Sequence, residues 1–381
     1  MAGPLSGVKV VELAGIGPGP FAAMLLSDLG ADVIRIDRAD KVNAAVFDRP
    51  NVDVLLRGRR SIGVDLKHPD GAETVLGLIE QADALVEGFR PGVMEKLGLG
   101  PDVCLARNPR LVYGRMTGWG QDGPMANASG HDINYIALAG ALAHFGRAES
   151  KPTPPINIVG DFGGGGLMMA FGVVCGVLEA RTSGQGQVLD VAMVDGAATL
   201  MAFVWGIKAL GAWDEARGVN VLDSGAPFYD TYETADGKFI ALGSLEGQFY
   251  AEMLEKTGLA DTGLPSQMDR SGWDEWRARF TETFKSKTRD EWDEILKGSD
   301  ACYAPVLTMS EAFTDDHMRA RGTFIERDGI PQPAPAPRFS RTPGVVEQGP
   351  SWPGQHTDEA LAEWGVPKER IAELRASGAV A

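Results

Sequence analysis

The chain has 381 residues, of which 44% are hydrophobic and 23% are charged, and its formal net charge at pH 7 is −16. These values are typical of a globular protein large enough for two domains, and the negative charge argues against nucleic acid or an anionic membrane as a partner. The three cysteines, Cys104, Cys175 and Cys302, are too scattered for a disulfide framework or a zinc site. Because the sequence also begins without a signal-like segment, it predicts a cytoplasmic protein that binds neither a metal nor a membrane.

The first part of the chain alternates short apolar segments with segments of helical periodicity. Residues 8–13 and 33–36 are rich in β-branched side chains and predict two buried strands. Residues 21–29 between them predict a helix, with Pro20 at its first position and Gly30 as its stop. So short a crossover implies parallel strands. Further elements follow in the same rhythm: strands at 61–66, 84–87 and 111–116, and a helix at 72–81. The expected fold is α/β, with a large Rossmann-like, doubly wound domain.

Two helices with a strongly apolar character are expected in the middle of the chain. A helix that begins near His131 should run to about residue 145, and the next covers residues 165–181. The latter is apolar nearly all round, which predicts a central buried helix. A strand at 187–193 and a further apolar helix at 196–210 follow. The two apolar helices at 165–181 and 196–210 serve either as connectors between domains or as part of a subunit interface.

The rhythm changes near residue 225. Residues 228–234 and 239–243 alternate as strands, and residues 235–238 between them give a strong hairpin signal. Helices are expected to open at Glu246 and to cover residues 273–284 and 289–296. This segment predicts a small α+β domain.

The last part of the chain returns to the large domain. Residues 330–337 are rich in proline and predict a stiff extended linker, whereas residues 357–376 predict a helix capped by Thr357. The expected organisation has four parts: residues 1–190 as the first part of the large domain, 191–224 as a linker helix, 225–307 as the small domain, and 308–381 as the return linker and the last part of the large domain.

Ligands of open α/β sheets bind outside the carboxyl ends of the strands. Here that rule points to Arg38 and to residues 64–67, 88–90 and 117–120. Basic side chains that could receive an anionic ligand on this acidic protein are Arg35, Arg38, Arg57, Arg59 and Arg60. The last three are equally compatible with a solvated loop.

The glycines after the first strand also permit a dinucleotide-binding interpretation. Gly15 and Gly17 fit the fingerprint, and Asp37 ends the second strand, as in a nicotinamide-dependent dehydrogenase. The third glycine position holds Pro20, where close packing of helix and strand requires a small residue. The match is therefore partial.

Two residues, His131 and Asp161, are candidates for acid/base catalysis. His131 stands at a helix start, and Asp161 precedes the glycine run 163–166; a histidine and a carboxylate suit proton transfer at the α carbon of a carbonyl compound. Each also has a structural interpretation: His131 as a helix cap or a core histidine, Asp161 as a helix cap, and the glycines as a packing device. Three methionines, Met168, Met169 and Met193, could line an acyl surface or belong to the core.

Several longer motifs carry a family resemblance that spans residues 5–376. The most specific are residues 11–13, 17–20, 88–92, 115–121, 130–135, 160–165 and 226–232. On these motifs the chain resembles the α-methylacyl-CoA racemases, the proton-shuttling branch of the family III CoA-transferases. The resemblance implies an interlocked homodimer, with each active site between the large domain of one subunit and the small domain of the other.

The resemblance also implies the reaction and the site. A racemase of this kind epimerises the α carbon of 2-methylacyl-CoA thioesters through an enolate, without a cofactor, since coenzyme A is part of the substrate. His131 and Asp161 are then the two acid/base residues, and Glu246 is the carboxylate that pairs with the histidine. The backbone near Asp161 would donate to the enolate oxygen. Residues expected along the CoA path are Arg38, Val64, Asp65, Leu66, Phe89, Arg90, Gly130, Asp132, Ile133, Asn134 and Tyr135.

Two alternatives remain within the same fold. A family III CoA-transferase would use Asp161 as a nucleophile and form acyl-anhydride and thioester intermediates. Such enzymes typically carry glutamine in the first glycine turn, where this chain has Ile16 and Gly17, and they lack a histidine like His131. The other alternative is a non-catalytic acyl-CoA-binding protein.

Overall fold

The computed structural model describes residues 3–381, and contacts divide them into two units. The first comprises the residues up to Ala139, Ile156–Leu200 and His317–Ala381, and the second comprises Gly140–Pro155 and Met201–Asp316. Compared with the boundaries expected from the sequence, this division places residues 140–155 and 308–316 in the second unit and residues 191–200 in the first.

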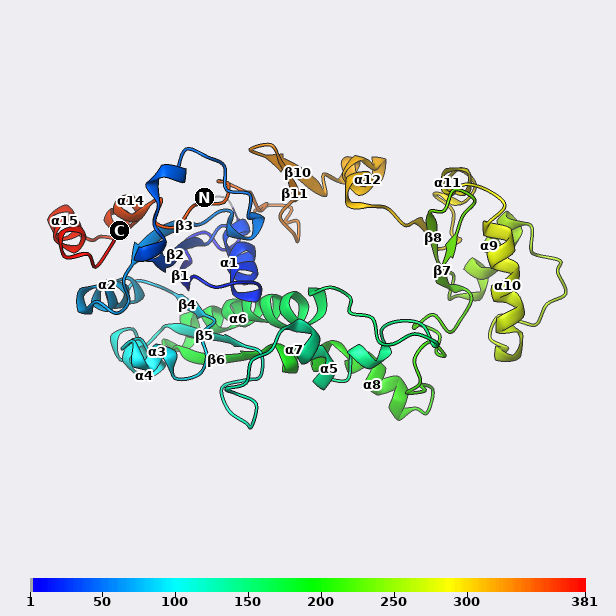
Figure 1. The fold of residues 1–381 in the computed structure, drawn as a ribbon, viewed down its shortest axis with the longest axis horizontal. Coiled ribbons are helices and arrows are strands. Elements are labelled where there is room, and N and C mark those ends of the chain that lie inside the picture. The colour runs from blue at the N-terminus through cyan, green and yellow to red at the C-terminus, as the bar shows by residue number, and fades with distance from the viewer. Residues whose placement is uncertain (1–2) are drawn as a thin grey trace. The chain divides into compact units, whose positions relative to one another are not determined.

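A six-stranded parallel sheet forms the centre of the first unit (Figure 1). Its strands are β1 (Lys9–Leu13), β2 (Asp32–Arg38), β3 (Arg60–Val64), β4 (Ala84–Glu87), β5 (Val112–Thr117) and β6 (Gln187–Ala192). They lie in the order β3-β2-β1-β4-β5-β6, and every adjacent pair is parallel. The predicted α/β class is confirmed, and the strand order reverses between β1 and β4.

Helices cover both faces of this sheet, and the central strands β1, β4 and β5 are accordingly buried on both sides. Helices α1 (Pro18–Asp28) and α6 (Met168–Ser183) pack on one face, and α2 (Pro69–Ile79) and α14 (Thr357–Glu363) pack on the other. Adjacent residues of β1 therefore enter different cores, Val10 with α1 and α6 and Val11 with α2 and α14. The remaining helical segments of this unit are η1 (Ala39–Lys41), η2 (Ala44–Val46), η3 (Val54–Leu56), α3 (Val93–Lys96), α4 (Pro101–Arg107), α5 (Asp132–Leu138), the π-helix η5 (Ile158–Leu167), α7 (Met193–Leu200), α13 (Asp316–Arg321) and α15 (Lys368–Ser377).

Several expected helices have different ends in the structure. α1 begins at Pro18 rather than Pro20, directly after Gly17, which has a φ of +70°. The helix expected from His131 to residue 145 ends at Leu138, where Gly140 with a φ of +81° follows, and only the short 3-10 turn η4 (Leu142–His144) comes after it.

Two further expected helices also differ from those in the structure. The helix expected at 165–181 starts earlier, because the π-helix Ile158–Leu167 runs directly into α6. The one expected at 196–210 is two helices, α7 and α8 (Ala202–Ala209).

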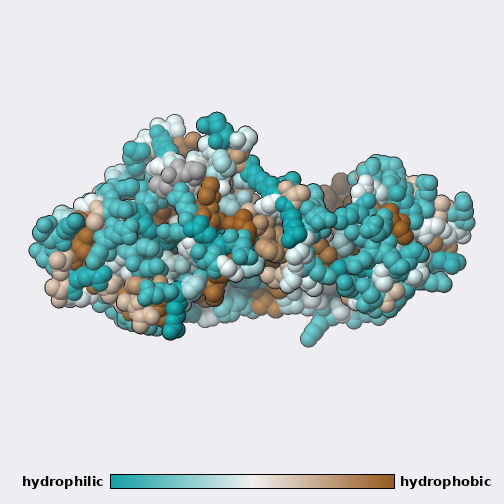
Figure 2. All heavy atoms as spheres, turned by 90° about the horizontal axis from the view of Figure 1, so that it is seen from above, coloured by the Kyte–Doolittle hydropathy of each residue, from teal (hydrophilic) through white to brown (hydrophobic). Residues whose placement is uncertain are grey.

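The prediction that residues 165–181 form a buried helix was wrong for one face of α6. Val173 and Val177 pack under the sheet, but Phe171 is 66% exposed and Leu178 is 69% exposed. By length and hydropathy the stretch 158–183 would also suffice to cross a membrane, although its inner face belongs to the core of the first unit. Figure 2 shows hydrophobic side chains gathered at the surface of the face that it draws.

The end of the chain also differs from the expectation. Part of the supposed stiff linker is a strand, because β11 (Ile330–Pro333) pairs antiparallel with β10 (Phe324–Arg327). The expected helix at 357–376 is interrupted at Gly365 and forms α14 and α15, and His356 rather than Thr357 occupies the cap position.

The second unit contains a small antiparallel sheet with the order β7-β8-β9. The predicted hairpin is confirmed by β7 (Tyr229–Glu233) and β8 (Phe239–Gly243), and β9 (Tyr303–Pro305) completes the sheet. Helices α9 (Gly247–Thr257), η6 (Arg270–Gly272), α10 (Trp273–Phe284) and α11 (Arg289–Leu296) lie between β8 and β9 in the chain, and α12 (Met309–Thr314) follows β9. Its core is aromatic, with Phe228, Tyr250, Trp276, Phe280, Phe284 and Trp292 all buried.

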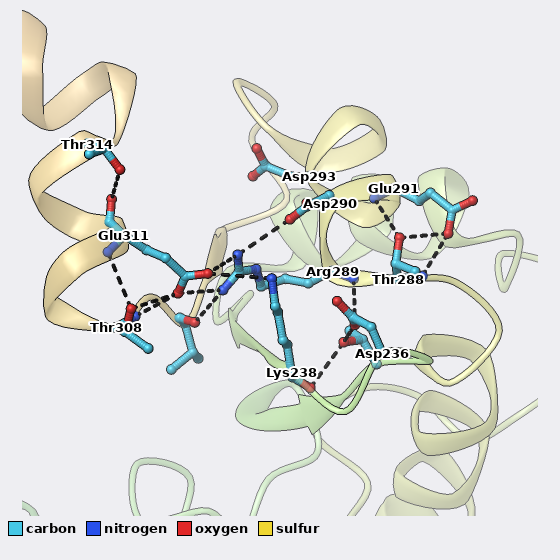
Figure 3. Close-up of polar contacts among 12 residues, drawn as sticks. Asp236, Lys238, Thr288, Arg289, Asp290, Glu291, Asp293, Thr308, Glu311 and Thr314 are labelled. Atoms are coloured by element: carbon cyan, nitrogen blue, oxygen red, sulfur yellow. Dashed lines mark hydrogen bonds and ion pairs between the residues drawn. The ribbon is translucent and has the colours of Figure 1, made fainter.

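An ionic network fixes α12 within this unit (Figure 3). The buried guanidinium of Arg289, at the start of α11, donates to both carboxylate oxygens of Glu311 on α12, at 2.8 and 3.1 Å. It also donates to the carbonyl oxygen of Val306 at 3.1 Å. The hydrogen bond from Arg289 holds the pKa of Glu311 well below its usual range. The segment after β9 is thereby tied to the helix layer.

Candidate active site

A cavity of about 690 Å³ opens at the carboxyl ends of β1, β4 and β5, where the strand order reverses. This is the position at which open α/β sheets bind ligands. Its walls include the glycine turn 14–20, the strand ends 86–91 and 116–119, and the loop residues 126 and 128–131. Both His131 and Asp161 line it. The structure therefore brings the two predicted acid/base residues to one cavity.

His131 stands at the cap position of α5, with extended backbone angles of −134° and 175°. Its side chain is exposed. The backbone N–H of His131 donates to Oδ1 of Asn134, one turn further on, at 3.0 Å. Asn134 does not line the cavity and instead fixes the backbone that presents the imidazole.

Asp161 is half-buried in the first turn of the π-helix. Its Oδ2 accepts a hydrogen bond from Nδ2 of Asn157 at 3.2 Å, and a Cβ built on Gly17 would lie 3.7 Å from the same oxygen. Burial raises the pKa of Asp161, the bond from Asn157 opposes that rise, and the charge of Asp132 adds to it. Sequence reasoning missed Asn157, although its position four residues before Asp161 on a helix was the available signal.

The carboxylate of Asp132 is buried and points to the backbone of the π-helix. Its Oδ2 accepts the N–H of Gly160 at 2.6 Å and the N–H of Asp161 at 2.9 Å. The expectation that the backbone near Asp161 donates to an enolate oxygen was therefore wrong for these two groups, because both are already paired. Nor does Asp132 line the cavity, contrary to its expected place on the CoA path.

The glycine run 163–166 is a packing device. A Cβ on Gly164 would lie 2.7 Å from the backbone nitrogen of Ala197, and one on Gly165 would lie 2.8 Å from the side chain of Met193. On Gly166 it would meet the ring of Phe21 at 2.6 Å. These glycines let α1 and α7 close on the π-helix, so close approach of a ligand to the backbone does not explain them.

Tyr135 and its neighbours form another wall. The Tyr135 hydroxyl donates to the carbonyl oxygen of Gly130, and its ring packs edge-on against Trp119 with centroids 4.9 Å apart. A Cβ on Gly118 would lie 2.2 Å from the Tyr135 ring. Tyr135, Gly130 and Met193 thus line the cavity, whereas Met169 is wholly within the core.

Phe89 and Arg90 also line the cavity. The Phe89 N–H donates to the carboxylate of Glu87 at 2.7 Å, and Nη2 of Arg90 donates to Oγ of Ser129 at 2.6 Å. Arg90 therefore brings a positive charge to the wall, where an anionic ligand would meet it.

Other residues expected on the CoA path lie outside this cavity. Arg38 and Val64 are register partners at the ends of β2 and β3, on the same edge of the sheet. Arg38 is 73% exposed at its side chain and forms an ion pair with Asp40 at 2.5 Å. The Val64 side chain is buried in the core. Asp65 and Ile133 are exposed, and Leu66 is partly buried against that core.

Three of the candidate arginines are buried in structural ion pairs. Arg57 pairs with Asp28 at 2.5 Å, and Arg59 pairs with Glu12 at 3.2 Å. Neither expected alternative, a ligand patch or a solvated loop, holds for these two. Arg35 is likewise buried. Arg60 pairs with Asp32 at the opposite, amino edge of the sheet.

Arg59 also supports one wall of the cavity, because its Nη1 donates to the carbonyl oxygen of Pro20 at 2.6 Å. It thereby fixes the glycine turn that faces Asp161.

Glu246 belongs to the second unit, where it is exposed at the cap position of α9. Its pairing with His131 stays a prediction. In the part of the chain that the structure describes, residues 3–381, no group of three or more histidine, cysteine, aspartate or glutamate side chains could hold a metal ion.

A family model described as CoA-transferase family III matches residues 5–357, and the chain belongs to that family. It is 47% identical over 373 residues to the α-methylacyl-CoA racemase of Mus musculus and 45% identical over 380 residues to that of Homo sapiens. Each alignment covers 97% of this chain and 96% of the relative. A CAIB/BAIF family protein from Brucella suis has a similar structure, with a TM-score of 0.82 at 25% identity, over 96% of this chain and 100% of the other. The resemblance expected from the sequence is confirmed.

Proposed function

We propose that the protein is an isomerase that epimerises the α carbon of 2-methylacyl-CoA thioesters. The observation that carries the proposal is the presence of His131 and Asp161 in one cavity at the switch point of the sheet. The identity of 45–47% to two α-methylacyl-CoA racemases over nearly the whole chain supports the same reaction.

The reaction needs only proton transfer. One of the two residues takes the α proton, the C–H electron pair enters the thioester carbonyl as an enolate, and the other residue delivers a proton to the opposite face. The enzyme recovers its starting protonation after the reverse turnover or by exchange with water. An imidazole is a suitable base near neutral pH. Burial raises the pKa of Asp161, which makes this carboxyl a better proton carrier than an exposed aspartate.

The enolate oxygen requires donors other than the N–H groups of Gly160 and Asp161, which Asp132 occupies. We assign that role to the first-turn N–H groups of α5, at Asp132 and Ile133, because they adjoin His131 and lie at the positive end of the helix.

The CoA moiety extends, in this proposal, from the cavity along the carboxyl edge of the sheet. Arg90 in the cavity and Arg38 beyond it supply positive charge on an otherwise acidic protein. Residues 64–66 accompany the path outside the cavity, and Gly130 and Tyr135 line its cavity end. Glu246 orients His131 and stabilises its charged form.

We also propose a homodimer. α6 exposes Phe171 and Leu178, α8 exposes Phe203, and Leu210 directly after α8 is 83% exposed. Large apolar side chains in such numbers on helices mark an interaction surface, and a second copy of the chain is the occupant that the family resemblance implies. The protein acts in the cytoplasm, which is compatible with its three free cysteines.

The dimer is tested by light scattering at micromolar concentration. A mass of two chains is expected, and the double variant Phe171→Glu, Leu178→Glu should yield one chain. A wild-type monomer would contradict this part of the proposal.

The alternative is a CoA-transferase with Asp161 as nucleophile. The carboxylate in the cavity favours it, but transfer chemistry assigns no task to His131.

Isotope exchange separates the two. One epimer of a 2-methylacyl-CoA is incubated with the protein in deuterium oxide without an acceptor acid. The racemase predicts α-deuterium together with the other epimer, and loss of epimerisation in His131→Ala and in Asp161→Ala. Absence of exchange, with CoA passing to an added free acid through an Asp161-dependent intermediate, would establish the transferase. CoA binding with neither reaction would indicate a binding protein.

A further inference from the structure

Asp132 connects the two proton-transfer residues, His131 and Asp161. In sequence it follows His131, as the first residue of α5, and in space it holds the backbone of Asp161. Its Oδ2 accepts two N–H groups, from Gly160 at 2.6 Å and from Asp161 at 2.9 Å. Hydrogen bonds to an ionised carboxylate are stronger than neutral ones and restrict the geometry of the groups that they join.

The surrounding chain is adapted to this contact. A Cβ on Gly160 would lie 2.7 Å from Oδ2 of Asp132 and 3.1 Å from the side chain of Ile136, so only glycine admits the approach. The π-helix turn that carries Asp161 therefore rests directly on α5.

The second carboxylate oxygen of Asp132, Oδ1, indicates that the negative charge has a role beyond the two hydrogen bonds. Asp132 is 5% exposed, and its Oδ1 is buried without a hydrogen-bond partner. An unpaired buried acceptor costs about 1–3 kcal/mol, and a neutral asparagine would accept the same two N–H groups through one oxygen. The two hydrogen bonds and the position in the first turn of α5 stabilise the charge, but they leave Oδ1 without a partner.

We propose that Asp132 is a positioning residue that couples the two proton-transfer residues, by holding the Asp161 backbone at a fixed place relative to His131 and by placing a negative charge beside the Asp161 carboxyl. This inference rests on the proposed function. The charge of Asp132 raises the pKa of Asp161, in the same direction as burial, while Asn157 and the charge of His131 lower it. Tyr135 also lies within the electrostatic reach of Asp161.

The test compares Asp132→Asn with Asp132→Ala. Asparagine retains an acceptor for the two N–H groups and removes the charge, whereas alanine removes both. A matched control is Asp83→Asn, because Asp83 accepts the backbone N–H of Lys9 at 2.9 Å at the amino edge of the same sheet. Epimerisation and α-deuterium exchange are measured from each epimer separately, across pH, and Asp161→Asn identifies the epimer from which Asp161 takes the proton.

For Asp132→Asn we expect an unchanged KM and a kcat lowered by roughly ten- to a hundredfold, because weaker, neutral hydrogen bonds let the Asp161 backbone shift and misplacement of about 1 Å costs such factors. With the Asp132 charge gone, Asp161 should ionise at lower pH. The acid limb of exchange from the Asp161-dependent epimer should then move to lower pH, and so should the titration of the Asp161 carboxyl followed by carbon NMR. Asp132→Ala should lose more activity, and Asp83→Asn should retain the wild-type profile.

Three results would contradict the inference. An unchanged kcat and Asp161 titration in Asp132→Asn would remove it outright. A loss of thermal stability without a shift of the acid limb would reduce Asp132 to a structural cap. A rise in KM alone would indicate a ligand contact. Failure of the proposed function is seen separately, as absence of exchange in the wild-type protein.

Discussion

His131 and Asp161 line the same cavity, yet the chain presents them from two different kinds of helix start. His131 is exposed, caps an α-helix of seven residues, and has its backbone held by Asn134. Asp161 is half-buried within a π-helix of ten residues, with its side chain held by Asn157 and its backbone by Asp132. The π-helix is packed between α1 and α7 through glycines.

The difference follows from the chemistry of the two groups. An imidazole exchanges protons near neutral pH and needs only to be aimed. A carboxyl must be partly desolvated to hold a proton under the same conditions, and desolvation of an ionisable group destabilises the folded state unless the group is hydrogen-bonded or paired. The supporting contacts are accordingly concentrated around Asp161. Four sets of variants test this difference between the surroundings of His131 and those of Asp161.

The largest effect is expected from His131→Gln and Asp161→Asn. Each should lower epimerisation by roughly 10²–10⁴-fold, the range for loss of a general acid or base. Each should still exchange the α hydrogen of one epimer with deuterium oxide, because the remaining residue can remove and return a proton on its own face. The two variants should exchange opposite epimers. Exchange of the same epimer by both would contradict the two-base assignment.

The glycine packing around the π-helix gives the next largest effect. A Cβ on Gly196 of α7 would lie 1.9 Å from the carbonyl oxygen of Gly164, so Gly196→Ala should lower the free energy of unfolding by about 1–3 kcal/mol or more. In Gly206→Ala on α8 the new Cβ meets nothing within 4 Å, and that control should gain about 0.5–1 kcal/mol. Ile133→Ala on the exposed side of α5 should change little. Urea unfolding measures all three, and equal losses at Gly196 and Ile133 would remove the asymmetry.

The third effect depends on pH. Because the folded state raises the pKa of Asp161, it binds the proton more tightly than the unfolded state, where the value is about 3.9. Ionisation of Asp161 therefore lowers stability as pH rises from that value through the higher folded one. Asp161→Asn should be more stable than the wild type at pH 7.5, with the difference shrinking toward pH 4. Urea midpoints along this range measure it, and a difference that grows toward acid would show that the sign is wrong.

The smallest effect concerns the backbone just before the π-helix. Ile156 has a φ of +53°, a strained conformation for a β-branched residue that costs about 1–3 kcal/mol. Ile156→Gly should remove that strain and, after the entropic cost of glycine, stabilise the protein by about 1 kcal/mol. Activity should fall severalfold if the strain helps to hold Asn157 against Asp161. Ile158→Gly, at a regular helical position, is the control and should lower stability.

Much of the architecture followed from the sequence because it depends on local periodicity. The six strands of the parallel sheet lie within two residues of their predicted ends, and α10 and α11 coincide with the expected ranges 273–284 and 289–296. The family and the two acid/base candidates also followed, since their motifs are contiguous. The helix ends at Leu138 and Ile158 did not, because one depends on the positive φ of Gly140 and the other on a π-helix that needs α1 and α7 around it.

Most of the strands and helices along the chain, the family, and the residue types available for proton transfer could be read from the sequence. The burial of Arg57 and Arg59 in ion pairs, the packing of helices on the glycine run, and the exposed face of α6 became evident only from the packed fold. It also decided that Asp132 holds the backbone of Asp161. The physical reason is that each of these facts depends on which residues, far apart in the chain, are brought into contact by folding. Spacing along a sequence records the side chains that a strand or helix offers, but the burial and hydrogen bonding of each side chain are set by the element packed against it.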